Sequence, residues 1–147
     1  MSSLTVAMGF VAGARTAPSP NCDARPGAIS PGLIVVHGIS LPPGRFGGPW
    51  IERLFMNTLP PDQDPYFATI QHLRVSSHVL IARDGALTQY VPFDERAWHA
   101  GTSHWRGRDA CNDFSIGVEL EGADDVPYDD RQYESLAELV AALQRAY

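Results

Sequence analysis

Hydrophobic residues follow one another without interruption from Leu33 to Val36, and the run ends at His37 and Gly38. A run of this kind, rich in β-branched residues, predicts a strand that is buried on both faces. A histidine at the end of such a strand is rigidly held and can be reached from a cleft. A lone histidine is more often a core residue bonded to a backbone carbonyl, so this pattern alone does not identify a site.

A second strand is predicted over 114–122, where side chains of two kinds alternate. One face comprises Ile116, Val118 and Leu120, and the other comprises Ser115, Gly117, Glu119 and Glu121. Gly117 leaves room beside Glu119 for a ligand or for another backbone. The same alternation also fits an amphipathic strand with a solvated outer face, so both interpretations stay open.

Three segments show the apolar spacing of amphipathic helices. The first begins at Pro49, a favoured first helical residue, and runs to about residue 59. A second, short helix begins at Pro65. The last begins at Asp129, where Gln132 completes a capping-box pattern. Its expected apolar stripe comprises Tyr133, Leu136, Ala137, Val140, Leu143 and Tyr147.

The remaining regular structure is predicted to be β-structure. The dipeptide Asp84-Gly85 is a strong hairpin signal, which predicts two strands over 75–91. A short strand is expected within 4–12, whereas the proline-rich segment 13–32 should be irregular. The order of these elements predicts an α/β domain with a central mixed β-sheet flanked by helices.

The segment 92–107 is predicted to be one long loop, and it holds Trp98, His99, His104 and Trp105. Long loops are uncommon inside compact domains, and those that occur are often functional. This loop is therefore a candidate part of a site.

Composition narrows the class of protein. The chain has 147 residues, 44% of them hydrophobic and 19% charged, which predicts one globular domain over 1–147. The net charge of −6 argues against non-specific binding to nucleic acid or to an anionic membrane. We expect no membrane span and no secretory signal, because apolar runs are short and no basic residue precedes Arg15. Cys22 and Cys111 are expected to be free thiols, with a single disulfide as the alternative.

Six motifs, in this order along the chain, resemble one family. They are LIVVH at 33–37, LPPG at 41–44, FGGPW at 46–50, VSSH at 75–78, WHAG at 98–101 and CNDFSIGVELEG at 111–122. Together they are similar to the zinc-dependent N-acetylmuramoyl-L-alanine amidases, and within them to the cytosolic branch that acts on 1,6-anhydro-muropeptides in cell-wall recycling. The resemblance implies an amidase/peptidoglycan-recognition-protein fold. It also implies hydrolysis of the amide between the lactyl group of muramic acid and the L-alanine of the stem peptide.

The resemblance also assigns roles to individual residues. His37 matches the first zinc ligand of the family, and Glu119 matches its catalytic glutamate. Arg74 matches a substrate-contacting position, and His99 lies in a loop that lines the site. Gly38 lies at a substrate-binding position where close relatives commonly carry asparagine, so any contact from that side chain is lost.

Zinc is the cofactor that the resemblance implies. A catalytic zinc needs about three protein ligands, and it lowers the pKa of a bound water to near 7. In the family the other ligands, a histidine and an aspartate, follow the last helix together with a lysine. We therefore expect the remaining ligands beyond Tyr147 and an incomplete domain over 1–147. The alternative is a metal-free muropeptide-binding module. We further expect a cytoplasmic monomer with a small-molecule muropeptide as partner, and neither nucleic acid nor membrane.

Overall fold

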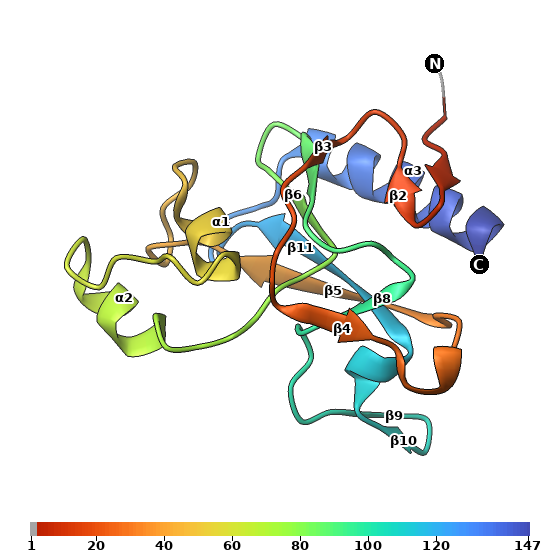
Figure 1. Cartoon of the computed structure of the whole chain (residues 1–147). Helices are drawn as coiled ribbons and strands as arrows, with labels where there is room; N and C mark the ends of the chain where they lie inside the picture. The colour runs from red at the N-terminus through yellow and green to blue at the C-terminus, as the bar shows by residue number, and fades with distance from the viewer. Residues whose placement is uncertain (1–2) are drawn as a thin grey trace.

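A mixed five-stranded sheet forms the centre of the computed structural model, which describes residues 3–147 (Figure 1). Met1 and Ser2, the start of the predicted domain, lie outside the described residues. The sheet has the order β3-β7-β6-β11-β5. Its strands are β3 (Arg15–Thr16), β5 (Leu33–Ile39), β6 (Val79–Ile81), β7 (Leu87–Gln89) and β11 (Ser115–Glu121). Only β6 and β7 run antiparallel, so the predicted mixed α/β fold is confirmed.

Strand β11, which pairs with β5 on one side and β6 on the other, is buried along its whole length. Its Ile116, Val118 and Leu120 pack in one core with Leu139 and Leu143 of the last helix. The opposite face of the sheet packs against the first two helices in a second core. That core includes Leu41, Ile51, Leu54, Phe55, Phe67 and Tyr90. The alternation along β11 therefore separates two buried faces, and the interpretation of one face as solvated is wrong.

Three α-helices flank the sheet, and they are α1 (Trp50–Phe55), α2 (Pro65–Ile70) and α3 (Asp130–Ala146). The capping box predicted at the start of α3 is confirmed, because the Asp129 and Gln132 side chains bond each other's backbone N–H. Helix α1 is shorter than predicted. It begins after Pro49 and ends at Phe55, because Asn57 adopts a left-handed backbone with φ of 61°. Tyr133, Ala137 and Tyr147 are exposed, so the predicted apolar stripe of α3 is wrong at these three positions. Leu139 and Ala142, which it left out, are buried.

Short strands form within 4–12, where one strand was predicted, and also within two segments that were predicted to be irregular or a long loop. Residues 4–12 form a hairpin of β1 (Val6–Ala7) and β2 (Phe10–Val11). The segment 13–32 contains the strands β3 and β4 (Cys22–Ala24) and the 3-10 turn η1 (Pro26–Ala28). The segment 92–107 contains the strands β8 (Glu95–Ala97) and β9 (His104–Trp105), and β9 forms a hairpin with β10 (Arg108–Asp109), just after this segment. Strand β4 pairs with β8, far away in the sequence. Pairings of this kind leave no periodic signal in a short segment, which is why the sequence did not predict them.

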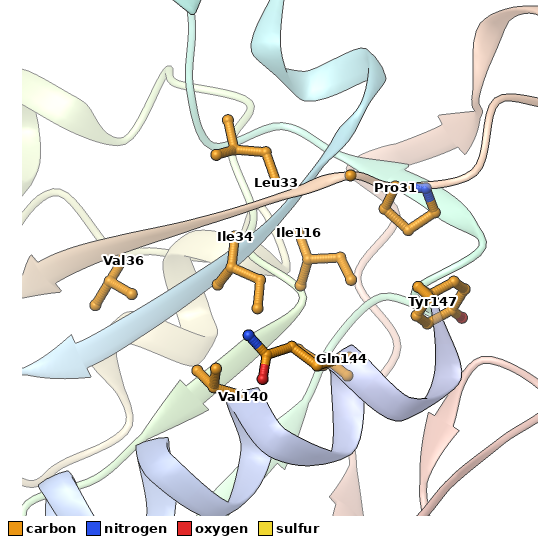
Figure 2. A pocket seen from close by; sticks show the side chains of 10 residues that line it. Pro31, Leu33, Ile34, Val36, Ile116, Val140, Gln144 and Tyr147 are labelled. Carbon is orange, nitrogen blue, oxygen red and sulfur yellow. The ribbon is translucent and has the colours of Figure 1, made fainter.

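Strand β5 lies at one edge of the sheet, and all of its residues are half-buried or exposed, so the prediction of a strand buried on both faces is wrong. Val36 is 47% exposed. It borders a cavity of about 590 Å³ between β5 and α3, which Ile34, Val140 and Tyr147 also line (Figure 2). This cavity lies on the face of β5 opposite to His37, because neighbouring residues of a strand point to opposite faces. Across residues 3–147, every helix is too short or too polar to cross a bilayer.

Candidate functional site

The parallel pairing of β5 with β11 brings His37 and Glu119 side by side. The two residues are direct partners in the register of these strands. Side chains at paired positions point to the same face of a sheet, so both lie on the face that carries α1. The structure thus brings together the two residues that the sequence singled out for zinc binding and for catalysis.

His99 joins this pair from the loop after β8. Its Nδ1 lies 2.9 Å from Nε2 of His37, and its Nε2 lies 3.1 Å from Oγ of Ser115. The ring also lies close against the backbone of β11 at Gly117, where an added Cβ would be only 2.5 Å from Cγ of His99. The space that Gly117 leaves beside Glu119 is therefore filled by the His99 ring.

Glu119 is a buried carboxyl group that lacks a full set of partners. It is 8% exposed, and among the described residues its Oε2 has no hydrogen-bond partner. Burial raises the pKa of Glu119 from 4.5 to about 8. A buried carboxyl that titrates near neutral pH is typical of groups that carry protons in active sites.

The histidines near Glu119 are neutral at neutral pH. Burial lowers the pKa of His37. Burial, with smaller contributions from the neighbouring His78 and His37, lowers the pKa of His99 to about 3. A neutral imidazole keeps a nitrogen lone pair, which is the form that binds a metal ion.

His78, in the segment before β6, has a structural role. Its Nδ1 accepts a hydrogen bond of 3.0 Å from the backbone N–H of Gly117, and its Nε2 donates to the carbonyl oxygen of Glu95 at 2.9 Å. Both ring nitrogens are therefore occupied. Burial lowers the pKa of His78 to about 3, which keeps the ring neutral.

The described residues do not form a complete zinc site. Residues 3–147 contain no group of three or more His, Cys, Asp or Glu side chains that could hold a metal ion. His37 and His99 supply neutral imidazoles next to Glu119, but their ring nitrogens contact each other. A zinc ion needs about three protein ligands, so these residues alone do not fit it.

Two other predicted site residues lie apart from this cluster. A Cβ at Gly38 would point into the hydroxyl of Tyr128, on the opposite face of β5, so only the backbone of Gly38 could meet a ligand beside His37. Arg74 is exposed, and its guanidinium donates to the carbonyl oxygens of His72 and Leu73 at 3.4 Å. Within the described residues, no hydrogen bond joins Arg74 to His37 or Glu119.

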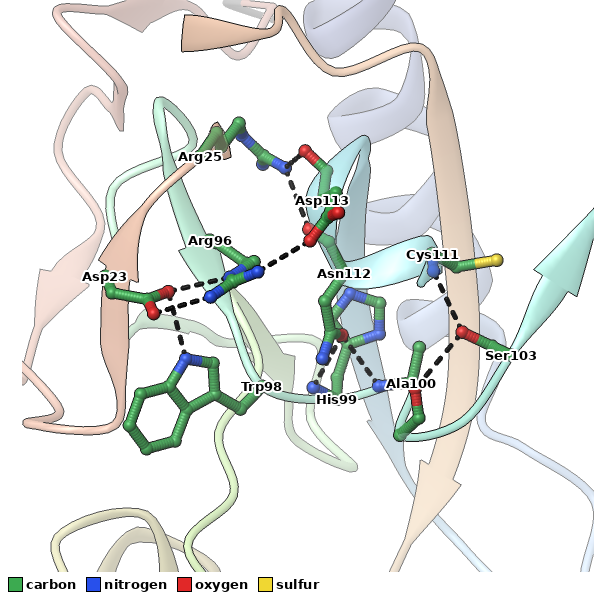
Figure 3. Close-up of polar contacts among 11 residues, drawn as sticks. Asp23, Arg25, Arg96, Trp98, His99, Ala100, Ser103, Cys111, Asn112 and Asp113 are labelled. Atoms are coloured by element: carbon green, nitrogen blue, oxygen red, sulfur yellow. Dashed lines mark hydrogen bonds and ion pairs between the residues drawn. The ribbon is translucent and has the colours of Figure 1, made fainter. Parts of the chain in front are cut away.

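Sequence reasoning missed the residues that hold the His99 loop in place. Asn112 belongs to the 3-10 turn η2 (Cys111–Asp113), just before β11. Its side-chain oxygen accepts hydrogen bonds from the backbone N–H groups of His99 and Ala100 (Figure 3). An asparagine in a turn next to a candidate strand was the available signal, because this side chain often bonds nearby backbone groups.

Comparisons with known proteins point to one family. Residues 28–147 match the model of the family described as N-acetylmuramoyl-L-alanine amidase. The 1,6-anhydro-N-acetylmuramyl-L-alanine amidase AmpD of Escherichia coli is 59% identical over 139 residues, which are 95% of this chain and 76% of the relative.

Solved structures give the same result. A crystal structure of a selenomethionine derivative of AmpD matches with a TM-score of 0.95 and 58% identity, over 97% of this chain and 79% of that one. The amidase AmiD of Escherichia coli, in complex with the substrate anhydro-N-acetylmuramic acid-L-Ala-D-γ-Glu-L-Lys, matches with a TM-score of 0.51 and 27% identity. That match covers 99% of this chain and 52% of AmiD.

Proposed function

Because the chain belongs to the N-acetylmuramoyl-L-alanine amidase family, we propose that it hydrolyses the amide between the lactyl group of 1,6-anhydro-N-acetylmuramic acid and L-alanine of the stem peptide. The relatives named as amidases of this specificity support the reaction, and the AmiD complex supports a muropeptide as the substrate. The reaction belongs to the recycling of peptidoglycan.

One observation of the site carries this proposal, namely the direct pairing of His37 with Glu119. We assign Glu119 the role of proton carrier. As a carboxylate, it takes a proton from the water whose oxygen forms a bond to the amide carbon. As the carbon–nitrogen bond breaks, it gives that proton to the leaving nitrogen. The products are the free lactyl carboxylic acid and the free amino group of L-alanine. Burial raises the pKa of Glu119 to about 8 in the metal-free fold, so this group can hold a proton near neutral pH, as the second step requires.

The remaining site residues take supporting roles in this proposal. His99 lines the site and contacts His37, whereas Arg74 would pair with a substrate carboxylate from the rim. Gly38 would contact substrate through its backbone alone. We also propose a cytoplasmic monomer.

We propose zinc as the cofactor, with His37 as one ligand and the other ligands outside residues 3–147. This leads to a prediction for the 147-residue chain by itself. Its dissociation constant for zinc, measured by calorimetric titration, should be micromolar or weaker, because about three ligands are needed for tight binding. His37→Ala is the matched variant and should weaken the remaining binding further. Nanomolar binding by the 147-residue chain would contradict the proposal.

Hydrolysis is tested on the protein translated from its natural reading frame. Supplied with zinc and 1,6-anhydro-N-acetylmuramic acid linked to an L-alanyl peptide, it should release the free sugar acid and a peptide with a free alanine amino group. Mass spectrometry resolves both products. The alternative, a metal-free muropeptide-binding module, is not favoured, because the relatives of high identity are named as amidases. Binding of the substrate without cleavage would support that alternative and contradict hydrolysis.

A further inference from the structure

Asn112 holds two consecutive peptide groups of the His99 loop with one atom. Its Oδ1 accepts hydrogen bonds from the N–H of His99 at 3.1 Å and from the N–H of Ala100 at 2.9 Å. A single acceptor shared by neighbouring N–H groups fixes both the position and the tilt of the backbone. This contact therefore restrains both the position of the loop beside β11 and its rotation.

The His99 backbone in turn decides where its ring lies. The ring occupies the gap over Gly117, with Nε2 against Ser115 and Nδ1 against His37. Each of these contacts is near its optimum length, so a shift of the backbone by 1 Å would break at least one of them. The His37 ring is half-buried, and His99 is its one side-chain hydrogen-bond partner among the described residues.

The turn that carries Asn112 is itself rigidly supported (Figure 3). Arg25, which is buried, donates to the carbonyl oxygens of Asn112 and Asp113 at 3.2 Å each. The Asp113 carboxylate pairs with Arg96 at 2.6 Å. Arg96 also pairs with Asp23, whose Oδ1 accepts a hydrogen bond from the Trp98 indole at 3.1 Å. The turn and the loop are thus fixed to a common framework, and Asn112 forms the link that is nearest to His99.

From these contacts we propose that Asn112 is a positioning residue of the site, whose side-chain oxygen fixes the His99 loop and thereby the orientation of the His37 ring. The proposal rests on the function proposed above, since it assigns His37 to that site. Asn112 acts through His99 and needs no contact with substrate.

Two variants separate the acceptor atom from the bulk of the side chain. Asn112→Leu keeps the size but removes the oxygen, whereas Asn112→Asp keeps an acceptor in the same place. In the metal-free chain labelled with 15N-histidine, Asn112→Leu should shift the ring nitrogen signals of His37 and His99. It should also speed amide hydrogen exchange at His99 and Ala100 by about tenfold or more relative to Gly117. Asn112→Asp should leave the ring signals and both exchange rates near those of the unaltered protein.

The control variant changes the neighbouring residue of the same turn. Asp113→Asn weakens the pair with Arg96 but leaves the Asn112 contact, so it should not move the His37 signals. Should Asn112→Leu fail to fold, Asn112→Ala gives the same comparison with less strain. Three results would each overturn the proposal. The first is that the ring signals stay unchanged in both variants that lack the oxygen. The others are that the Asp and Leu variants have equal effects, or that exchange at Gly117 becomes faster to the same extent as at His99 and Ala100. Because these spectra need neither zinc nor substrate, they do not depend on whether the protein hydrolyses a muropeptide.

Discussion

Replacing Glu119 with glutamine is expected to lower kcat for hydrolysis of the 1,6-anhydro-muropeptide by about 10²- to 10⁴-fold. Glutamine has the same shape but can neither accept the proton of the attacking water nor return it to the leaving nitrogen. Because Oε2 of Glu119 has no hydrogen-bond partner among the described residues, the substitution breaks no contact of that atom. The fold should therefore persist while the reaction stops, as initial rates and a thermal melt measured on one preparation would show.

Glu121 provides the matched control, because it lies on the same face of the same strand. Its carboxylate accepts hydrogen bonds from the N–H groups of Gly47 at 2.8 Å and of Arg83 at 3.3 Å, so it anchors the loop after β5. Glu121→Gln keeps one acceptor and should retain kcat within about threefold. Equal losses of activity in the two variants would mean that Glu119 has no special part in proton transfer.

Replacing Arg25 with leucine is expected to destabilise the protein by about 3 to 5 kcal/mol. Arg25 is 4% exposed and donates to three carbonyl oxygens, those of Phe93, Asn112 and Asp113. Leucine fills part of the volume but leaves these buried acceptors without partners. Urea unfolding followed by fluorescence would measure the loss.

An exposed arginine gives the comparison for this variant. Arg15 forms an ion pair of 2.6 Å with Glu52, but its side chain is 59% exposed. Arg15→Leu should cost less than about 1 kcal/mol, because water solvates such a pair well. If Arg25→Leu lowered the free energy of unfolding no more than Arg15→Leu does, the result would contradict a stabilising role for the buried hydrogen bonds that Arg25 makes to the η2 turn.

The sequence predicted the strands of the site better than their surroundings. The alternation over 114–122 placed Glu119 and Gly117 on one face, and the structure has β11 in that place. The apolar run at 33–36 predicted a strand correctly, yet an apolar run does not say which strands lie beside it. The edge position of β5 follows from pairing with a strand some 80 residues away, and local patterns carry no information on such pairings.

The contacts of His99 could not be predicted from the sequence for a similar reason. The length and composition of the 92–107 loop made His99 a candidate, and the WHAG motif placed it at the site through the resemblance to a family, but neither predicted its contacts. Its ring lies on Gly117 because β11 has no Cβ there, and its backbone is held by Asn112 from a separate turn. Both contacts join residues from different segments of the chain, and the sequence alone does not show which segments lie close together in the fold.

The ionisation of Glu119 also has a consequence for stability. In the unfolded chain this carboxyl loses its proton near pH 4.5, but in the metal-free fold it keeps the proton up to about pH 8. The folded state therefore binds more protons between these two values, so the free energy of unfolding falls as the pH rises through that window. The loss is at most about 5 kcal/mol in total, and it should vanish in Glu119→Gln.

The most direct test of the site is the pKa of Glu119 itself, measured by 13C NMR on metal-free protein with labelled glutamate side chains. Assignment through Glu119→Gln identifies the signal. A buried carboxyl beside the neutral His37 ring should titrate with a midpoint at about 8. A midpoint near 4.5 would show a hydrated or paired carboxylate, and it would contradict the assignment of Glu119 as the proton carrier.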